Sequence, residues 1–417
     1  MSAHFEVRAR LTRPGEADPG GRTGVIRTSH GVIETPAFIP VGTKATMKAV
    51  LPESMASAGA QALLANAYHL YLQPGADIVA GAGGLGAFMN WPGPTFTDSG
   101  GFQVLSLGAG FKKVLAMDTA IRSDDVIAPG KDRLARVDDD GVTFKSHLDG
   151  SSHRFTPEVS MAVQRQLGAD IIFAFDECTT LVNTRDYQVR SLERTRLWAR
   201  RCIAEHQRLA AEDPDRRQYL YGVVQGAQYR DLRRRAAGDL AGMEFDGYGI
   251  GGALDKSRLG EIVGWVTEVL PADRPRHLLG IGEPDDLFAA IERGADTFDC
   301  VAPSRLARNG SVYSPGGRYN IGSAMNRRSY EPLADGCDCY TCGHYTRAYL
   351  HHVYKAREMI CSTLLTIHNE RFIVGLVDRI RLSIEDGSFD EFRLDFLRGY
   401  YGPSAEPTAA VTEGGLA

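Results

Sequence analysis

The sequence predicts an α/β fold in which a parallel sheet closes into a (β/α)8 barrel of the TIM type. From residue 168 onward, apolar strands alternate with amphipathic helices and no hairpin intervenes, which indicates a parallel sheet. Each of these strands is followed by a polar or glycine-rich group, and a barrel would bring such strand ends to one site. A doubly wound sheet has the same alternation, but no G-x-G-x-x-G motif follows a strand to support a dinucleotide-binding fold.

The N-terminal part is predicted from local signals. Residues 1–23 hold Pro14, Pro19 and several glycines among mixed charges, and we expect a loosely ordered lead-in there. The expected elements that follow are two strands, a helix and a further strand, at 24–27, 32–40, 51–58 and 60–65.

The alternating region should contain five strands with helices between them. The strands are expected at 170–175, 219–224, 247–250, 277–281 and 296–298. The helices are expected at 186–211, 229–240, 257–270 and 284–293, where apolar residues recur at helical spacing. The groups that end the strands are Asp176-Glu177-Cys178, Gln225-Gly226, Gly251-Gly252, Gly282-Glu283 and Asp299.

Two segments depart from this alternation. Residues 115–140 interrupt it and are expected to form a mobile insertion. The tail 401–417, rich in Ala, Gly, Pro and Glu, is expected to be disordered. We therefore expect 24–400 to form a single catalytic domain.

The charge balance excludes a general nucleic-acid binder. The chain has 47 basic and 52 acidic residues, a net charge of -5, so a polyanion must bind to a local patch. Residues 300–330 offer one, with five arginines and no Asp or Glu. No apolar run is long enough to cross a membrane and no charged-then-apolar leader follows Met1, so we expect a cytoplasmic protein that does not bind membranes.

The cysteines predict a metal site. The seven cysteines, an odd number in a chain this long, do not indicate a disulfide framework, and three of them, Cys337, Cys339 and Cys342, fall within six positions. With the later His368 they would fill a tetrahedral zinc shell, which leaves no place for water and indicates one structural ion in a subdomain at about 320–370. The alternatives for the fourth ligand are His344, His351 and His352.

Two carboxylates are the candidates for catalysis. Asp299 ends an expected strand ahead of an arginine-rich loop, and Asp98 stands in the loop Asp98-Ser99-Gly100-Gly101-Phe102. Either acid alone is more often a turn cap, but paired carboxylates cleave bonds at the anomeric carbon of a sugar. Asp-Ser-Gly-Gly also occurs in trypsin-like serine proteases, yet those are secreted antiparallel barrels with disulfides, which nothing here indicates.

Several motifs in order resemble the tRNA-guanine transglycosylases, also called queuine tRNA-ribosyltransferases, in their bacterial branch. The likeness covers roughly residues 22–400. It runs through His30-Gly-Val-Ile-Glu-Thr-Pro-Ala-Phe, Asn66-Ala-Tyr-His-Leu, Asp98-Ser-Gly-Gly-Phe-Gln, Phe175-Asp-Glu-Cys, Val224-Gln-Gly, Ile250-Gly-Gly, Gly280-Ile-Gly-Glu-Pro-Asp-Asp, Phe298-Asp-Cys-Val and the cysteine cluster with His368.

The resemblance implies a zinc-bearing TIM barrel that acts on tRNA as a homodimer. Such enzymes exchange guanine at the wobble position of G-U-N tRNAs, the Asp, Asn, His and Tyr types, for a 7-deazaguanine, the pre-queuosine base. By this resemblance, Asp299 is the nucleophile that forms a covalent ribosyl intermediate, and Asp98 is the general acid/base. Two inversions at C1′ give net retention, which calls for carboxyl groups about 5 Å apart.

The resemblance also implies the binding residues. Those for the base are Ser99, Gly100, Gly101, Phe102, Asp176, Cys178, Gln225, Gly251 and Gly252. Those for RNA are Gly280, Ile281, Gly282, Glu283, Pro284, Asp285, Asp286, Ser304, Arg305, Leu306, Ala307 and Arg308. Within these sets, Asp176 and Gln225 face the pyrimidine edge of guanine, the Gly252 backbone faces its oxygen, and Phe102 stacks on the ring.

The chain departs from the family at three places. Ala253-Leu254-Asp255-Lys256-Ser257 replaces the usual Leu-Ala-Val-Gly-Glu, so either 7-aminomethyl-7-deazaguanine or queuine could be preferred, with Asp255 as a possible acceptor for the amine. His277 replaces a tyrosine, and the loop after Cys178 lacks a common proline. Two alternative functions are a non-catalytic tRNA-binding partner subunit and a hydrolytic N-glycosidase.

Overall fold

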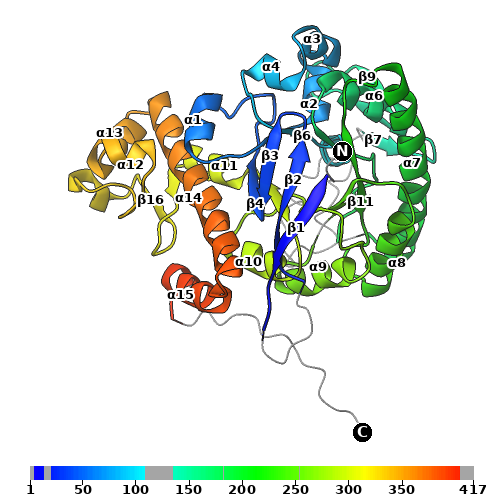
Figure 1. Ribbon diagram of the computed structural model, residues 1–417. Coiled ribbons are helices and arrows are strands. Elements are labelled where there is room, and N and C mark those ends of the chain that lie inside the picture. Colours follow the sequence, from blue (N-terminus) through cyan, green and yellow to red (C-terminus); the bar gives the residue numbers. More distant parts are fainter. Residues whose placement is uncertain (1–3, 14–19, 109–134, 182, 253, 404–417) are drawn as a thin grey trace.

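The central element is an eight-stranded parallel sheet that closes into a barrel (Figure 1). The computed structural model describes residues 4–13, 20–108, 135–181, 183–252 and 254–403. The strands are, in barrel order, β4 (Ala37–Pro40), β5 (Leu63–Ala65), β6 (Thr95–Thr97), β10 (Ile171–Phe173), β11 (Tyr219–Val224), β12 (Gly247–Ile250), β13 (Arg276–Leu278) and β14 (Thr297–Cys300). Pairing of β14 with β4, together with a parallel bridge from Val41 to Leu64, closes the ring. The predicted barrel is confirmed.

Helices cover the outside of the barrel, and the helices predicted at 51–58, 186–211, 229–240, 257–270 and 284–293 are among them. They are α1 (Pro52–Ser57), α6 (Pro157–Leu167), α7 (Arg185–Glu212), α8 (Arg230–Ala241), α9 (Leu259–Thr267), α10 (Pro284–Glu292) and α14 (Met359–Glu385). The side chain of Thr184 caps α7 by accepting a hydrogen bond from Tyr187 N. α14 packs against β4 and so covers the barrel beside its first strand.

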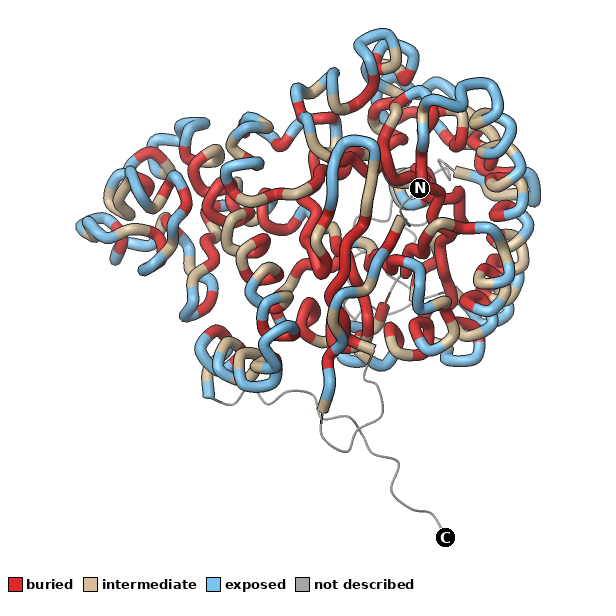
Figure 2. Tube along the Cα trace, viewed as in Figure 1, coloured by how far each residue is buried: buried red, intermediate tan, exposed pale blue. Residues whose placement is uncertain are grey.

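Side chains alternate along the strands and so contribute to two apolar cores. Figure 2 shows in red the residues that are buried along the chain. In β11, Tyr219, Tyr221 and Val223 belong to the core inside the barrel. Leu220 and Val224 belong to the larger core between sheet and helices. Because both faces are buried, the strand reads as a continuous apolar run, the pattern expected of a parallel sheet.

The N-terminal lead-in differs from the expectation for residues 1–23. Phe5–Arg10 forms strand β1, which pairs antiparallel with β2 (Arg22–Thr28), and β2 pairs with β3 (Gly31–Thr35). The phenyl ring of Phe5 is buried beneath the Arg22 guanidinium, 4.8 Å from the ring centre. The prediction of a loose lead-in is therefore wrong for residues 5–10. This segment contains three charged residues and is only weakly apolar, so its sequence does not indicate a strand, and pairing with the later strand β2 orders it.

Arg22 also fixes the N-terminal end of β14. Its guanidinium donates to both carboxylate oxygens of Asp296, at 2.9 and 2.7 Å, and both side chains are fully buried. Arg276 N donates to the same carboxylate at 2.8 Å. The barrel strand that ends at the catalytic candidate Asp299 is thus anchored at its opposite end.

Two further segments were expected to be irregular, at 115–140 and 401–417. Of the expected insertion at 115–140, residues 115–134 lie outside the described residues, whereas Ala135–Val137 forms β7 and joins β8 (Val142–Lys145) and β9 (Ser152–Phe155) in an antiparallel sheet. The expected tail mostly lies outside the described residues, and Tyr401 ends helix α15 (Phe389–Tyr401). Within the described ranges, no helix combines the length and apolar composition needed to span a bilayer.

A small C-terminal subdomain lies on one side of the barrel (Figure 1). It contains β15 (Ser311–Val312), β16 (Tyr319–Asn320), α12 (Tyr340–His344), α13 (Arg347–Lys355) and the first turns of α14. Its own apolar core is made by Val312, Ile321, Leu333, Leu350 and Leu364. Because α14 belongs to both the subdomain and the barrel, it joins the two rigidly.

Candidate active site

The predicted site residues meet at the carboxyl end of the barrel. Asp98 follows β6, Asp176 follows β10, Gln225 follows β11 and the pair Gly251 and Gly252 follows β12. Asp299 lies within β14 at the same end. Because all eight strands are parallel in a closed ring, these positions surround one mouth.

Asp98 is partly buried and held by the loop after β5. Its Oδ2 accepts a hydrogen bond from Asn66 Nδ2 at 2.5 Å, and Oδ1 accepts from Ala67 N at 2.7 Å. Burial, and to a smaller extent the negative charge of Asp299, raise the pKa of this carboxyl to about 6 against the opposing effect of hydrogen bonds from Asn66, Ala67 and Gln103. A carboxyl that titrates near neutral pH can both give and take a proton.

Asp299 is held through a single oxygen. Its Oδ1 accepts hydrogen bonds from Gly280 N and from His277 Nε2, each at 3.0 Å. The His277 side chain is fully buried, whereas that of Asp299 is 14% exposed and so reaches the mouth. The carboxylate therefore has one restrained oxygen and a route to solvent.

Asp176, Ser99 and Gln225 form a hydrogen-bonded polar cluster, the acceptor pocket of this site. Ser99 Oγ donates to Asp176 Oδ1 at 3.0 Å, and Gln225 Nε2 donates to Asp176 Oδ2 at 2.6 Å. Burial, and to a smaller extent the charge of Asp98, raise the pKa of this carboxyl to about 6 against the opposing effect of the two side-chain hydrogen bonds. The carbonyl oxygen of the Gln225 side chain is buried without a partner. The pocket is therefore set to accept hydrogen bonds from a ligand that carries N–H groups.

Glycines let backbone come close to this pocket. A Cβ at Gly101 would lie 2.6 Å from the carbonyl oxygen of Asp176, and Gly252 has a φ of +85°. The ring of Phe102 is 44% exposed beside them and can lie against a flat ligand. Cys178 lies in the same region, and burial raises the pKa of its thiol well above the ordinary value, so it is not a thiolate nucleophile.

Arg233 is a functional candidate that the sequence did not single out. It is fully buried in α8 and donates to the carbonyl oxygens of Val224 at 3.0 Å, Ala227 at 2.8 Å and Gly251 at 2.8 Å. Burial lowers the pKa of its guanidinium to about 9. One guanidinium thus braces the loops after β11 and β12, which carry Gln225 and Gly252.

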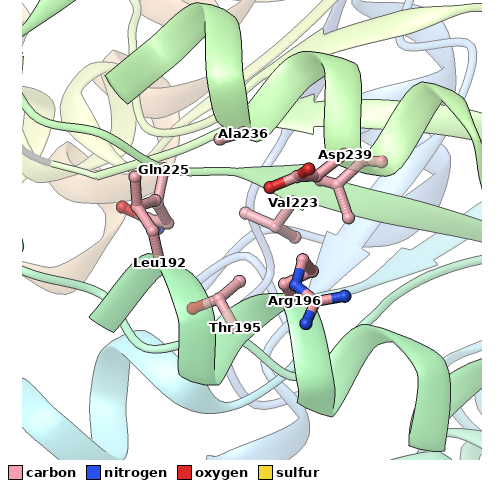
Figure 3. Close-up of a pocket in the computed structure, with 8 residues that line it drawn as sticks. Leu192, Thr195, Arg196, Val223, Gln225, Ala236 and Asp239 are labelled. Atoms are coloured by element: carbon pink, nitrogen blue, oxygen red, sulfur yellow. The ribbon is translucent and has the colours of Figure 1, made fainter. Parts of the chain in front are cut away.

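A narrow cleft lies between α7 and α8 (Figure 3). Gln225 lies at one end of it, and Arg196 and Asp239 lie at the other. The full lining is Leu192, Thr195, Arg196, Val223, Gln225, Ala236, Asp239 and Leu240. Its walls come from α7, α8 and the end of β11, and Gln225 belongs both to this lining and to the polar cluster around Asp176.

The two loops expected to contact RNA differ in charge. In the loop after β13, Glu283 pairs with Arg318 and Asp286 with Lys256, each at 3.1 Å, and Tyr401 donates to Asp285 at 2.7 Å. Gly280 is exposed, whereas Ile281, Gly282 and Pro284 are buried.

The second loop forms α11 (Ala302–Arg308). There Arg305 is exposed and Arg308 is half-buried, while Ser304 and Ala307 are buried and Leu306 is packed against the core. The arginines are therefore the side chains of this loop that are best placed to meet an anion.

The predicted metal ligands come together. The sulfur atoms of Cys337, Cys339 and Cys342 lie 3.6, 3.5 and 3.3 Å from His368 Nδ1. Zinc bonds of about 2.3 Å to sulfur and 2.1 Å to nitrogen give a tetrahedral S–N edge of about 3.6 Å. His368 Nε2 donates to Tyr313 O at 2.8 Å, which leaves Nδ1 free to bind a metal. The alternative His344 is exposed and hydrogen-bonds Tyr340 O, so the four residues fit one zinc ion.

The raised pKa of Asp176 predicts a stability change. Its folded value of about 6 exceeds an unfolded value of about 3.9, so the stability it contributes is present below about pH 4 and is lost as pH rises through 6. We expect Asp176→Asn to raise the free energy of unfolding by about 2 kcal/mol at pH 8 and to have no effect at pH 4. Rotation of the Gln225 amide would let its unpartnered oxygen accept from the new Asn.

Denaturant unfolding at the two pH values measures this change. Asp273→Asn is the matched control, because the Asp273 side chain is 75% exposed and should leave stability unchanged at both pH values. An Asp176→Asn variant less stable than the unmodified protein at pH 8 would contradict this account of the pocket.

Comparison with known proteins agrees with this geometry. The family model described as queuine tRNA-ribosyltransferase matches residues 18–402. The queuine tRNA-ribosyltransferase of Symbiobacterium thermophilum is 45% identical over 403 residues, 96% of this chain and 93% of that protein. Those of Pelotomaculum thermopropionicum and Caldanaerobacter subterraneus subsp. tengcongensis are each 44% identical, over 92% and 94% of this chain and 96% and 97% of their own.

Proposed function

The chain belongs to the queuine tRNA-ribosyltransferase family, and on that premise we propose that it exchanges guanine at the wobble position of G-U-N tRNAs for the pre-queuosine base. The substrates would be the Asp, Asn, His and Tyr tRNAs. The observation that carries the proposal is the meeting of Asp98 and Asp299 at one barrel mouth, beside a pocket of hydrogen-bond acceptors. Base exchange requires such a pair of carboxylates and such a pocket.

The reaction would proceed by two displacements. A carboxylate oxygen of Asp299 attacks C1′ of the ribose, the C1′–N9 bond breaks, and guanine leaves with a proton from Asp98. The incoming base then gives its N9 proton to Asp98, attacks C1′ and displaces Asp299. A pKa of about 6 suits Asp98 to both transfers near neutral pH. The two inversions leave the β-nucleoside configuration unchanged.

The pocket residues suit a purine-like base. Asp176 would accept from the N1–H and the exocyclic amine, with Gln225 beside it. The backbone N–H of Gly252 would donate to the exocyclic oxygen, and Phe102 would stack on the ring. Ser99, Gly100, Gly101, Cys178 and Gly251 would shape the walls. Arg233 supports this assignment. It donates to the carbonyl oxygen of Gly251, which belongs to the same peptide unit as the Gly252 N–H, and so fixes the direction of that N–H.

The choice of incoming base would depend on the loop after β12. In this loop Asp255 Oδ1 accepts from Ser257 N at 3.1 Å and from Ser257 Oγ at 2.7 Å, so Oδ2 is the oxygen available to an aminomethyl group. The ammonium group of Lys256 forms a salt bridge with Asp286 and not with Asp255. We place the amine of the pre-queuosine base against Asp255; direct competition between that base and queuine tests this choice.

The anticodon would bind across the mouth with its wobble nucleotide turned out of the stack. Arg305 and Arg308 would meet phosphates or neighbouring base edges. The loop after β13 would approach the backbone through Gly280, since its acidic side chains are paired with Lys256, Arg318 and Tyr401. That pairing lowers the repulsion between Glu283, Asp286 and RNA phosphates.

The C-terminal subdomain would hold one structural zinc ion and contribute to a homodimer. Cys337, Cys339, Cys342 and His368 fill all four positions, so the ion would stabilise the fold rather than bind substrate. Exposed apolar side chains gather on the same subdomain, including Met325 at 73% and Tyr330 at 76% exposure. An apolar surface of this kind supports association with a second copy.

Incorporation of labelled guanine into a G-U-N tRNA tests the function. We expect one label per tRNA, at the wobble position, with the backbone intact. The control is the same tRNA with adenine in place of the wobble guanine, which should take up no label. Binding of the tRNA without incorporation of labelled guanine would favour a non-catalytic tRNA-binding subunit. Release of guanine that leaves an abasic site in the tRNA would favour a hydrolytic N-glycosidase.

A further inference from the structure

We propose that His277 is a positioning residue for Asp299. It holds one carboxylate oxygen, leaves the other to attack the ribose, and favours the free carboxylate over the ester formed during the reaction. The inference rests on the proposed function, because it concerns the covalent step.

The His277 ring has a fixed place inside the barrel. It is fully buried in β13 and lies between the rings of Phe96, at 5.6 Å, and Phe173, at 5.2 Å between ring centres. Nδ1 lies 2.9 Å from Thr297 Oγ1, and Nε2 lies 3.0 Å from Asp299 Oδ1. Both ring nitrogens are therefore engaged, and rotation of the ring would break two hydrogen bonds.

The partners determine which nitrogen carries the proton. A carboxylate can only accept, so the nitrogen facing Asp299, Nε2, must donate. In a neutral imidazole Nδ1 is then an acceptor, and the Thr297 hydroxyl can supply the hydrogen. Asp299 thus sets the tautomer, and the Thr297 hydroxyl supports it by donating to Nδ1.

The same arrangement distinguishes the two oxygens of Asp299. The hydrogen bonds that described residues donate to this carboxylate, from His277 and Gly280, both go to Oδ1. Oδ2 is therefore the oxygen with lone pairs available to C1′. In the first displacement the Oδ2–C1′ bond forms, the C1′–N9 bond breaks with its electron pair going to the base, and Asp98 protonates the base.

Charge changes on Asp299 give His277 an energetic effect as well. Asp299 is an anion before the first displacement and a neutral ester after it. A hydrogen bond to an ionised acceptor is about twice as strong as one to a neutral acceptor. His277 therefore stabilises the carboxylate more than the ester, which promotes departure of the carboxylate in the second displacement and limits accumulation of the ester.

The test compares His277→Phe with the unmodified full-length protein. Each is brought to equilibrium with a G-U-N tRNA at one fixed guanine concentration, and the covalent protein–tRNA adduct is quantified on a denaturing gel. Phe keeps an aromatic ring between Phe96 and Phe173 but cannot donate. We expect the ratio of adduct to non-covalent complex to rise about 5- to 10-fold, while the rate of guanine exchange falls.

Two further variants separate hydrogen bonding from packing. His277→Gln carries an amide N–H that can reach Oδ1, and should return the ratio toward that of the unmodified protein. Thr297→Val removes the hydroxyl that donates to Nδ1 and should raise the ratio in the same direction as Phe, whereas Thr297→Ser should not. Zinc content and the unfolding midpoint are measured for each variant. If His277→Phe does not fold, the comparison of Thr297→Val with Thr297→Ser decides the question.

The inference is overturned if the ratio of adduct to non-covalent complex in His277→Phe or Thr297→Val is equal to or below that of the unmodified protein. A merely structural role for His277 predicts such a fall, because a displaced Asp299 would form less ester. Absence of adduct in the unmodified protein is a different result, since it overturns the proposed function together with the inference.

Discussion

Asp299→Asn is expected to reduce guanine exchange by about 10⁴-fold or more, because an amide is a poor nucleophile and removal of a nucleophile commonly costs that much. The substitution keeps the size of the side chain and an oxygen that can accept from His277 and Gly280. The measurement is the initial rate of labelled guanine incorporation into a G-U-N tRNA. Affinity for the tRNA should change little, since the proposed phosphate contacts come from α11.

Asp395→Asn on α15 is a matched control of the same chemistry, remote in sequence from the loops of the barrel mouth, and should exchange guanine at the unmodified rate. Retention of more than about a tenth of the activity by Asp299→Asn would remove Asp299 from the role of nucleophile. Loss of zinc or of tRNA affinity in that variant would instead indicate a disturbed fold.

His368→Ala is expected to lose the bound zinc and to lower the free energy of unfolding by more than about 3 kcal/mol, because binding of a structural zinc ion contributes directly to folding. His368 is fully buried near the start of α14, where it also donates to Tyr313 O. Zinc analysis by mass spectrometry and denaturant unfolding measure the two effects. Exchange activity should fall with stability, since α14 packs against both α11 and β4.

His344→Ala provides the matched control for this prediction. His344 is exposed, lies in sequence next to the cysteine cluster and bonds only a carbonyl of its own helix among the described residues. The His344→Ala variant should therefore keep about one zinc ion per chain. Unchanged zinc in His368→Ala with loss in His344→Ala would contradict the ligand assignment.

The barrel could be predicted because its signals are local. Strands β11 and β12 have the expected bounds, since a strand buried on both faces is a continuous apolar run bounded by turn residues. The close spacing of Cys337, Cys339 and Cys342 likewise indicates a metal without reference to the fold. By contrast, the choice between His368 and His344 needed the fold, which buries one near the sulfur atoms and exposes the other.

Other features depend on contacts between distant segments. Strand β1 is stabilised by pairing with β2 and by burial of Phe5, neither of which its charged sequence indicates. Arg233 stands beside Arg234 and Arg235, and only the packing of α8 on the barrel decides which of the three is buried. His277 meets Asp299 because the register of β13 and β14 places it opposite Thr297, a relation that no spacing rule provides.

Mapping the covalent adduct tests the central claim most directly. The unmodified protein is mixed with a G-U-N tRNA without added base, denatured, and digested with ribonuclease and protease for mass spectrometry. The account predicts a ribonucleotide lacking its base, attached to the peptide that contains Asp299, at the carboxyl side chain of that residue. Attachment at Asp98 or at the neighbouring Cys300, or a protein free of adduct while guanine is exchanged, would contradict it.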